Sequence, residues 1–147
     1  EPNDTVTREE FVKICGNICG LDSSDKTVVF SDEVSEEWYT GYLKAAYDSG
    51  LVRGRDDGTF GIGEPVSRQD MAVILYNIIK AHIDSVKEPQ NKFDDAEIIS
   101  EYAKDAVSCL SELGIINGTG DNLFSPLDTA TRAEAAKMAF GILEYVK

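Results

Sequence analysis

An arginine follows a serine or threonine at three points of the chain, and an acidic residue stands two positions after each arginine. The three motifs are Thr7-Arg8-Glu9-Glu10, Ser67-Arg68-Gln69-Asp70 and Thr131-Arg132-Ala133-Glu134. The hydroxyl and the acid have the spacing of a capping box, which predicts that each motif opens a helix. Each arginine then takes the first helical position, where the helix dipole disfavours a cation by about 0.3–1 kcal/mol. Capping therefore accounts for the hydroxyls and the acids, but not for the arginines.

Two interpretations of these arginines remain open. In the first, each guanidinium neutralises a neighbouring acid such as Asp32 or Asp95, because the chain carries 27 acidic and 14 basic residues. In the second, the guanidinium and the amides of the helix N-terminus together bind a carboxylate or a phosphate, since both present N–H donors to an anion. The net charge of −13 argues against nucleic acid and anionic membrane surfaces as partners.

The motifs belong to a longer repeat. Equivalent residues lie 64 positions apart, as Gly50 and Gly114 or Phe60 and Phe124 do. The first motif matches the later two, so the chain holds the second half of one repeat followed by two whole repeats. We predict one domain over residues 1–147, divided into residues 1–29, 30–92 and 93–147.

Each whole repeat predicts a helix, a glycine-rich loop and a second helix, which gives an all-α fold. Apolar residues recur at helical spacing from Trp38 to Tyr47, and again from Tyr102 to Leu113. Gly50 and the matching Gly114 then predict the ends of these helices. The loops over 51–60 and 115–124 are rich in residues that favour tight turns, and a second helix follows each arginine motif.

Metal, cofactor and enzyme functions find little support in the sequence. Cys15 and Cys19 stand one helical turn apart, but the sister helices carry aliphatic residues there, so we expect core thiols rather than a metal site. The stretch Asp56-Asp57-Gly58 lacks the alternating ligands of a calcium loop. His82 lies in a polar connector and pairs with no nucleophile, so we expect a non-catalytic chain without a cofactor.

The composition fits a folded domain, with 42% hydrophobic residues. No apolar run approaches the roughly 20 residues that a membrane span needs. The first residues have neither the basic nor the apolar part of a signal peptide. Composition alone does not decide between a cytosolic protein and a piece of an exported one.

The order of the motifs resembles the S-layer homology repeat, and the resemblance covers nearly the whole chain. It rests on the following segments: Phe30-Ser31-Asp32 and Phe93-Asp94-Asp95, then Trp38, then Gly50-Leu51-Val52-Arg53-Gly54 and Gly114-Ile115-Ile116-Asn117-Gly118, then Asp57-Gly58-Thr59-Phe60 and Phe124-Ser125-Pro126, and the arginine motifs.

This resemblance implies helical repeats around a pseudo-threefold axis, with the helices that open at the arginine motifs meeting centrally. It implies noncovalent attachment of a larger exported protein to secondary cell-wall polysaccharide, typically to a terminal pyruvate-ketal sugar, at the cell surface or in an S-layer. Grooves of the family lie between adjacent repeats. The residues that it assigns to ligand binding are Arg8, Arg68, Arg132, Trp38, Tyr102, Asp32, Asp95, Gly54 and Gly118.

The chain departs from the family pattern at several positions. Tyr102 replaces the tryptophan of the last repeat, and Gln69-Asp70 replaces Ala-Glu in the middle motif. Because the opening repeat is only half present, we expect at most two complete grooves. From its residues alone, Trp38 is interpreted as a core residue. A protein–protein docking module remains the alternative function.

Two further arginines lie in the first glycine-rich loop, on either side of Gly54. Arg53 and Arg55 either pair with the adjacent Asp56 and Asp57 or attract an anionic polymer. The sequence leaves both interpretations open.

Overall fold

The structure, a computed structural model, describes residues 4–83 and 92–146. Over these residues the chain forms five α-helices and three single-turn 3₁₀ helices, and no β-strand. The α-helices are α1 (Arg8–Cys19), α2 (Thr40–Asp48), α3 (Arg68–Ile79), α4 (Lys104–Glu112) and α5 (Arg132–Phe140), and the 3₁₀ helices are η1 (Ala96–Ile98), η2 (Glu101–Ala103) and η3 (Leu143–Tyr145). The prediction of an all-α fold is confirmed.

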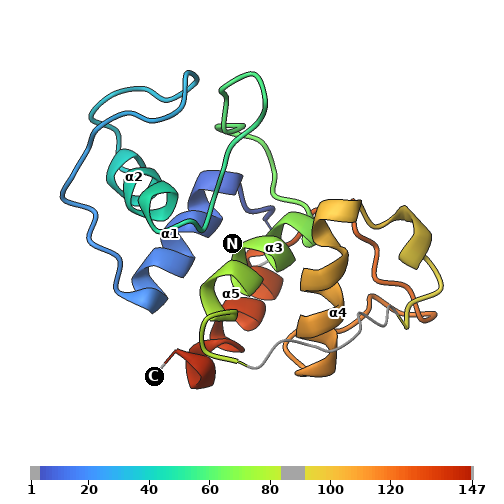
Figure 1. Cartoon of the computed structure of the whole chain (residues 1–147). Helices are drawn as coiled ribbons and strands as arrows, with labels where there is room; N and C mark the ends of the chain where they lie inside the picture. Colours follow the sequence, from blue (N-terminus) through green and yellow to red (C-terminus); the bar gives the residue numbers. More distant parts are fainter. Residues whose placement is uncertain (1–3, 84–91, 147) are drawn as a thin grey trace.

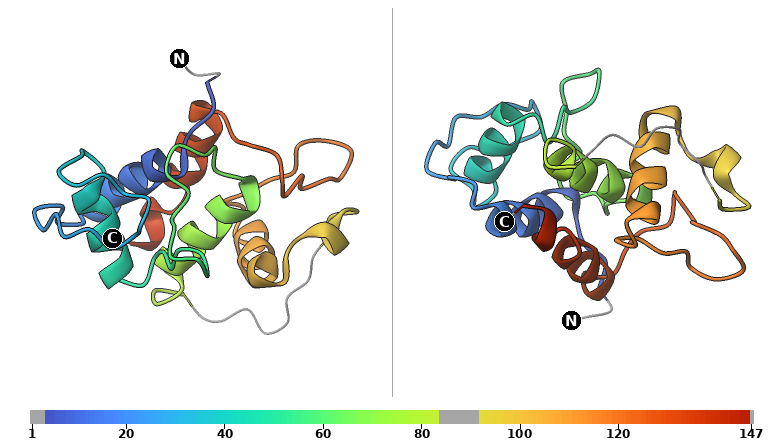
Figure 2. Two further views of the ribbon diagram at one scale, coloured as in Figure 1. Left: turned by 90° about the horizontal axis from the view of Figure 1, so that it is seen from above. Right: turned by 60° about the horizontal axis from the view of Figure 1, so that its bottom comes forward.

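The three helices that open at the arginine motifs, α1, α3 and α5, lie in the middle of the molecule (Figure 1). Helix α2 flanks α1 on one side and α4 flanks α3 on the other, while α5 packs beside α1 (Figure 2). The segments before the three central helices pair with one another through isolated antiparallel bridges. These bridges join Thr7 with Pro65, Ser67 with Thr129 and Thr131 with Thr5. Three motifs far apart in sequence therefore meet in one ring.

The hydroxyl caps form at all three central helices. The side-chain oxygens of Thr7, Ser67 and Thr131 accept from backbone N–H groups of α1, α3 and α5 at 3.2, 3.2 and 3.1 Å. Only Glu10 completes the box, by accepting from the backbone N–H of Thr7 at 3.0 Å. The capping prediction is therefore confirmed for the hydroxyls and for one of the three acids.

The outer helices end at the predicted glycines and start later than predicted. Gly50 and Gly114 follow the last turns of α2 and α4 with φ of 77° and 74°, a left-handed conformation that glycine adopts without strain. Trp38 precedes α2, and Tyr102 lies in η2 before α4. Trp38 is 45% exposed, so its interpretation as a core residue is wrong. Tyr39, which is 5% exposed, takes the core position at this point.

One hydrophobic core runs through the molecule, with Phe11, Phe60 and Phe124 fully buried in it. Cys15 is part of this core as predicted, and burial raises the pKa of its thiol. Over the residues described, no group of His, Cys, Asp and Glu side chains is arranged to hold a metal ion. Over the same residues, no helix is long and apolar enough to cross a membrane.

Candidate functional site

The three arginines form ion pairs across the ring, each with the acid of another arginine motif. Arg8 Nη1 lies 2.6 Å from Asp70 Oδ2, and Arg68 Nη1 lies 2.9 Å from Glu134 Oε2. Arg132 pairs with Glu10 and so closes the ring. The hypothesis that each arginine neutralises an acid is therefore confirmed. Its choice of Asp32 and Asp95 as the partners is wrong.

Asp32 and Asp95 instead hold the two glycine-rich loops in shape. The Asp32 carboxylate accepts backbone N–H bonds from the three residues 60–62, at 2.8, 2.8 and 2.9 Å. Asp95 accepts only two, at 2.9 and 2.8 Å, because Pro126 stands in the third position and has no N–H. Burial acts to raise the pKa of Asp32, but the backbone donors outweigh it and hold this pKa below its usual value.

The first amide of each central helix is already bonded within the protein. The backbone N–H groups of Arg8, Arg68 and Arg132 donate to carbonyl oxygens of Glu64, Asp128 and Asp4, each at 2.9 Å. These carbonyls belong to the segments that pair in the ring. The amides of these three first helical residues are therefore not available to an anion, and the hypothesis that guanidinium groups and helix amides bind an anion together stays a prediction for the remaining amides.

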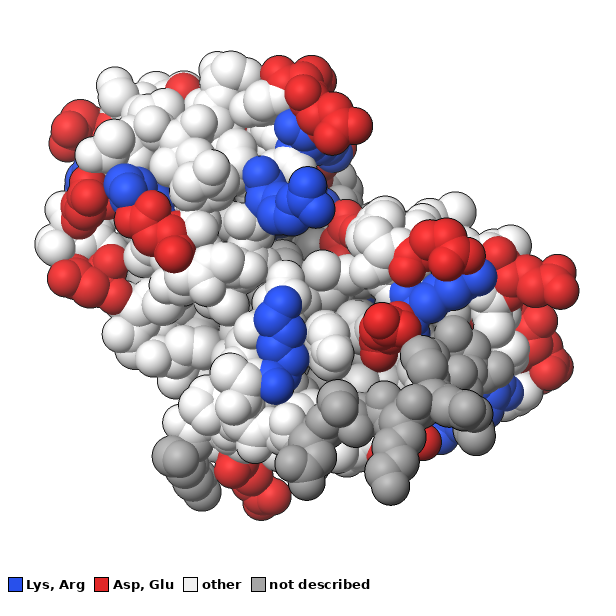
Figure 3. Space-filling view, in the orientation of Figure 1, with Lys and Arg blue, Asp and Glu red and all other residues white. Residues whose placement is uncertain are grey.

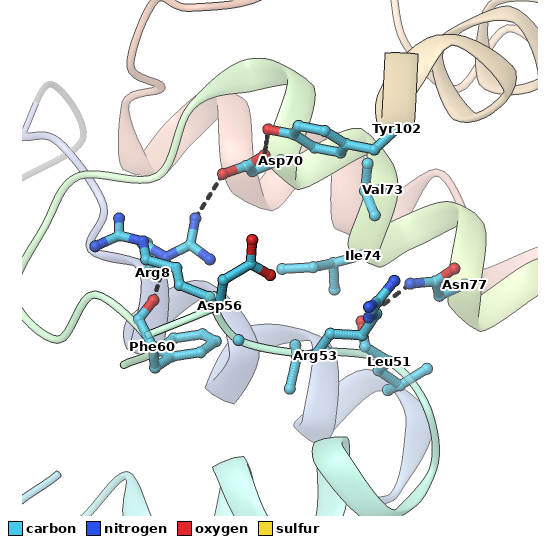
Figure 4. A pocket seen from close by; sticks show the side chains of 13 residues that line it. Arg8, Leu51, Arg53, Asp56, Phe60, Asp70, Val73, Ile74, Asn77 and Tyr102 are labelled. Carbon is cyan, nitrogen blue, oxygen red and sulfur yellow. Dashed lines mark hydrogen bonds and ion pairs between the residues drawn. The ribbon is translucent and has the colours of Figure 1, made fainter. Parts of the chain in front are cut away.

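A pocket of about 540 Å³ lies between Arg8, the loop over 51–56 and helix α3, and we call it the Arg8 groove (Figure 4). It brings together three of the predicted site residues, Arg8, Gly54 and Tyr102, each from a different repeat. Val73 and Ile74 of α3 add apolar surface to it. The expectation of a groove between repeats, lined by an arginine and a glycine-rich loop, fits this pocket.

Several cationic groups of the Arg8 groove retain unpaired donors. Arg55 makes a bidentate ion pair with Glu64 at 2.8 and 2.7 Å, so its pairing with Asp56 or Asp57 is wrong. Arg53 is exposed and makes no hydrogen bond or ion pair with the residues that the structure describes, so the same prediction fails for it. Arg8 uses Nη1 for Asp70 and Nε for the Phe60 carbonyl at 2.9 Å. Its Nη2 bonds to none of the described residues.

The charge distribution over one face of the molecule suits an anionic ligand better than the net charge of −13 suggests. In Figure 3, basic side chains lie near the centre of the face, next to a hollow, while acidic side chains gather mainly towards its edges. An anion that approaches the centre meets cations first, even though the whole chain is acidic.

A second, smaller pocket repeats this arrangement around Arg68, and we call it the Arg68 groove. Its volume is about 120 Å³, and its lining is Arg68, Asn117, Gly118, Glu134, Lys137 and Met138. Arg68 is only 5% exposed. Its Nε donates to the Phe124 carbonyl at 2.8 Å, Nη1 to Glu134 at 2.9 Å and Nη2 to the Asn117 carbonyl at 2.7 Å. All three of its nitrogens are therefore engaged within the protein.

Steric contacts account for the two predicted loop glycines. A Cβ atom at Gly54 would lie 2.4 Å from the Phe30 ring, and one at Gly118 would lie 2.5 Å from the Leu123 carbonyl oxygen. Gly54 also has φ of 81°. Both glycines line their grooves, but the packing of the loops is sufficient to explain them.

Trp38 and Arg132, which are also among the predicted site residues, line neither of the two grooves. Arg132 has a side chain that is 43% exposed and paired with Glu10. The ammonium of Lys13 lies 5.4 Å from the centre of the Trp38 ring, so a cation already occupies one face of this aromatic residue.

Asn77 lines the Arg8 groove but is not among the predicted site residues; its side chain donates to the Leu51 carbonyl at 3.1 Å and ties α3 to the loop. A polar residue among the isoleucines at the end of α3 was the signal for it. Gln69, which was predicted only as a departure from the family pattern, is buried and donates to the Tyr102 hydroxyl.

Comparison with known proteins gives a family match in both whole repeats. The family model described as the S-layer homology domain matches residues 29–72 and 92–136. The exoglucanase XynX of Acetivibrio thermocellus is 35% identical over 147 residues, which is 98% of this chain and 13% of that protein. The S-layer protein sap of Bacillus anthracis is 33% identical over 138 residues, 93% of this chain and 16% of that protein.

Among solved structures, the undecaheme cytochrome from the S-layer of Carboxydothermus ferrireducens shares the fold, with a TM-score of 0.55 at 18% identity. The match covers 100% of this chain and 18% of that one, so the chain spans less than a fifth of each of these three proteins. The matched family and the S-layer relative indicate a location at the cell surface, in the cell wall or S-layer. With both whole repeats matched and helices in the expected order, the chain belongs to the S-layer homology domain family.

Proposed function

We propose that this chain is a non-catalytic module that anchors a larger exported protein to the cell wall. It binds an anionic saccharide of secondary cell-wall polysaccharide in the Arg8 groove. The observation that carries this proposal is the combination of Arg53 and Arg8 Nη2, both without a described partner, with an aromatic ring and apolar side chains in one pocket of about 540 Å³.

The lining of the groove supports an acidic sugar as the ligand. Guanidinium N–H groups form charge-assisted hydrogen bonds with a carboxylate. Arg53 offers a guanidinium without a described partner and Arg8 offers Nη2, from different sides of the pocket (Figure 4). The ring of Tyr102 and the side chains of Val73 and Ile74 offer apolar surface to the C–H faces of a sugar. A terminal pyruvate ketal, which carries a carboxylate and a methyl group on a sugar ring, fits both parts of this lining.

The relatives support an anchoring role. One is named as an exoglucanase and another as an S-layer protein, yet each matches nearly all of this chain with only 13% or 16% of its own length. A segment common to proteins of such different names favours attachment over catalysis.

Calorimetric titration tests the proposal with a pyruvate-ketal N-acetylmannosamine glycoside and, as the matched ligand control, the same glycoside without the ketal. We expect the wild-type chain to bind the ketal and not its parent. Arg8→Ala removes the cation that faces the pocket and is expected to weaken binding at least about tenfold.

Arg132→Ala is the matched protein control, because this arginine lies outside both grooves and its loss should leave binding unchanged. If neither glycoside binds to the folded chain, the anchoring proposal is overturned for this groove. Equal binding of ketal and parent would also contradict it, since the carboxylate would then contribute nothing.

A further inference from the structure

Three departures of this chain from the family pattern lie together at one place in the structure. Gln69 and Asp70 stand where the pattern has Ala-Glu, and Tyr102 stands where it has tryptophan. In the sequence, Tyr102 is more than 30 positions from the other two. In the structure all three side chains belong to one hydrogen-bonded chain beside the Arg8 groove.

Gln69 begins this chain of hydrogen bonds, and it is only 4% exposed. Its Oε1 accepts from the backbone N–H of Ser100 at 3.0 Å, and its Nε2 donates to the Ser100 hydroxyl at 3.0 Å. The same Nε2 donates to the Tyr102 hydroxyl at 3.2 Å. A single buried amide therefore fixes both the segment that carries Tyr102 and the phenol itself.

The chain continues from Tyr102 to the groove arginine. The Tyr102 hydroxyl donates to Asp70 Oδ1 at 2.6 Å, and Asp70 Oδ2 accepts from Arg8 Nη1 at 2.6 Å (Figure 4). Both carboxylate oxygens of Asp70 are thus engaged, one by the aromatic residue of the groove and one by its cation. Arg8 is left with Nη2 directed to no described partner.

The acids of the first two arginine motifs are used differently. At Glu10, the longer side chain reaches back to the Thr7 N–H and completes the capping box. Asp70 is one methylene shorter and makes no such bond to Ser67, which leaves Oδ1 for the phenol. Tryptophan has one N–H donor and no acceptor, so it could not accept from Gln69 and donate to Asp70 as the Tyr102 hydroxyl does.

The other two arginine motifs show no equivalent arrangement in the described residues. Ala133 occupies the position of Gln69 in the last motif, and Glu134 there accepts from Arg68 and the Thr131 hydroxyl. In the first motif, Glu9 takes that position and accepts from the backbone N–H of Gly63. The Gln69 arrangement is therefore confined to the Arg8 groove.

We propose that Gln69 is a positioning residue for saccharide binding: it fixes Tyr102 across the Arg8 groove, and Tyr102 fixes Asp70 against Arg8 so that Nη2 faces the ligand. This inference rests on the proposed function of the groove. Gln69 itself contacts no ligand and acts through its two neighbours.

A double-mutant cycle with Gln69→Met and Tyr102→Phe tests this proposal. Methionine keeps the length and most of the volume of glutamine, and phenylalanine keeps the ring, so each variant removes hydrogen bonds and little else. Each single variant is expected to weaken binding of the ketal glycoside about fivefold. The double variant is expected to bind the glycoside with about the affinity of the single variant that binds it less tightly, because both changes break the same chain of hydrogen bonds.

A measurement without ligand accompanies the cycle. Burial of the phenol and the bond to Asp70 raise the pKa of Tyr102 to about 12. Loss of the Gln69 donor alone would raise this pKa further, whereas release of the phenol from Asp70 would lower it. The positioning role therefore predicts that phenolate absorbance at pH 11, after subtraction of the Tyr102→Phe background, is small in the wild type and larger in Gln69→Met. Asn17→Ala is the matched control, since it removes a similar tyrosine–amide bond, to Tyr42 at 3.1 Å, far from the groove, and should change neither readout.

The outcomes separate this inference from the proposed function. If the wild type binds the glycoside but Gln69→Met binds equally well, or if the two single effects multiply in the double variant, the positioning role is overturned and the anchoring role stands. If the wild type binds no glycoside, the anchoring role fails. In that case an unchanged Tyr102 absorbance in Gln69→Met overturns the positioning of Tyr102 as well.

Discussion

The Arg8 and Arg68 grooves are built from equivalent residues, yet they use their arginines differently. Each arginine bonds through Nε to the carbonyl of a buried phenylalanine and through Nη1 to the acid of another motif. Among the residues that the structure describes, Arg68 also bonds through Nη2, to the Asn117 carbonyl, and Nη2 of Arg8 bonds to none. All three nitrogens of Arg68 are therefore bonded within the protein, whereas Nη2 of Arg8 has no partner among the described residues. The difference shows that a repeated motif can bond all three guanidinium nitrogens within the protein in one repeat and leave one of them without a described partner in another.

The other residues that line the Arg8 and Arg68 grooves also differ. Val73 and Ile74 of the Arg8 groove are replaced by Lys137 and Met138 in the Arg68 groove, and Arg53 is replaced by Asn117. Both arginines lie over the ring of a phenylalanine, at 4.9 Å for Arg8 and 5.0 Å for Arg68, so this contact is common to both. The pockets measure about 540 and 120 Å³.

The largest expected effect is a loss of stability in Arg68→Ala. This change removes a 5% exposed cation and leaves two backbone carbonyls and Glu134 without their donor. We expect the free energy of unfolding in urea to fall by about 3 kcal/mol. Binding of the ketal glycoside should persist under conditions where the variant is folded. Lost binding in a folded Arg68→Ala would contradict the division of roles.

The next largest loss of stability is expected when the acid that holds each glycine-rich loop is removed, and it should differ between the two loops. Asp32→Ala removes an acceptor of three backbone N–H bonds, so we expect a loss of about 2 kcal/mol in the free energy of unfolding. Asp95→Ala removes an acceptor of two and should cost less. Equal losses, measured by chemical unfolding, would show that the third bond contributes nothing.

The Asp32 effect has a defined pH dependence. Because the pKa of Asp32 is lower in the folded chain than its usual value, its stabilising contribution is complete above that usual value. The contribution disappears as the pH falls through the lowered folded pKa. The difference between the wild type and Asp32→Ala should therefore shrink when unfolding is measured from pH 7 down to pH 3. A difference that stays constant would mean that the charge of Asp32 is irrelevant.

A smaller effect is expected from exchanging one loop residue between the grooves. Arg53→Asn gives the Arg8 groove the residue of the Arg68 groove and should weaken glycoside binding about fivefold without changing stability. The reverse change, Asn117→Arg, should create no second site, because the main-chain carbonyl of residue 117 still engages Arg68. A second binding event in Asn117→Arg would show that the side chain, and not the carbonyl, closes that groove.

The smallest loss of stability is expected at the ion pair between Arg132 and Glu10. Arg132 is 43% exposed and bonds to Glu10, so Arg132→Ala should change the free energy of unfolding by less than about 1 kcal/mol. Added salt should reduce even this difference. A loss in urea unfolding as large as that of Arg68→Ala would mean that the ring, and not the burial of Arg68, provides the stability.

Much of the local structure was predictable from the sequence because its signals are local. The hydroxyl caps, the glycine stops of α2 and α4 and the all-α fold follow from residues within one or two turns of each other. The partner acids of the arginines were not predictable in this way. Asp70 has the spacing of a capping residue, and its bond to Arg8 depends on how segments 62 positions apart meet.

The difference between the two grooves was not predictable either, because it also depends on contacts between segments that are distant in sequence. Arg8 and Arg68 stand in nearly identical motifs, and what separates them is the path of a main-chain carbonyl at residue 117. Trp38 and Tyr102 occupy matching positions in the repeat, but only Tyr102 lines the Arg8 groove, beside Asp70. Residue identity predicted the kinds of groups present, and tertiary contacts decided which of them remain available.

The most direct test of this account is a titration of the chain with the ketal glycoside, followed by NMR of the arginine Nε–H signals. Both Nε–H groups donate to carbonyls, so both signals are expected to be protected from exchange, and Arg8→Lys and Arg68→Lys variants assign them. The account predicts that the Arg8 signal shifts with the ligand while the Arg68 signal stays in place. A shift of the Arg68 signal, or a stationary Arg8 signal while the ligand binds, would contradict it.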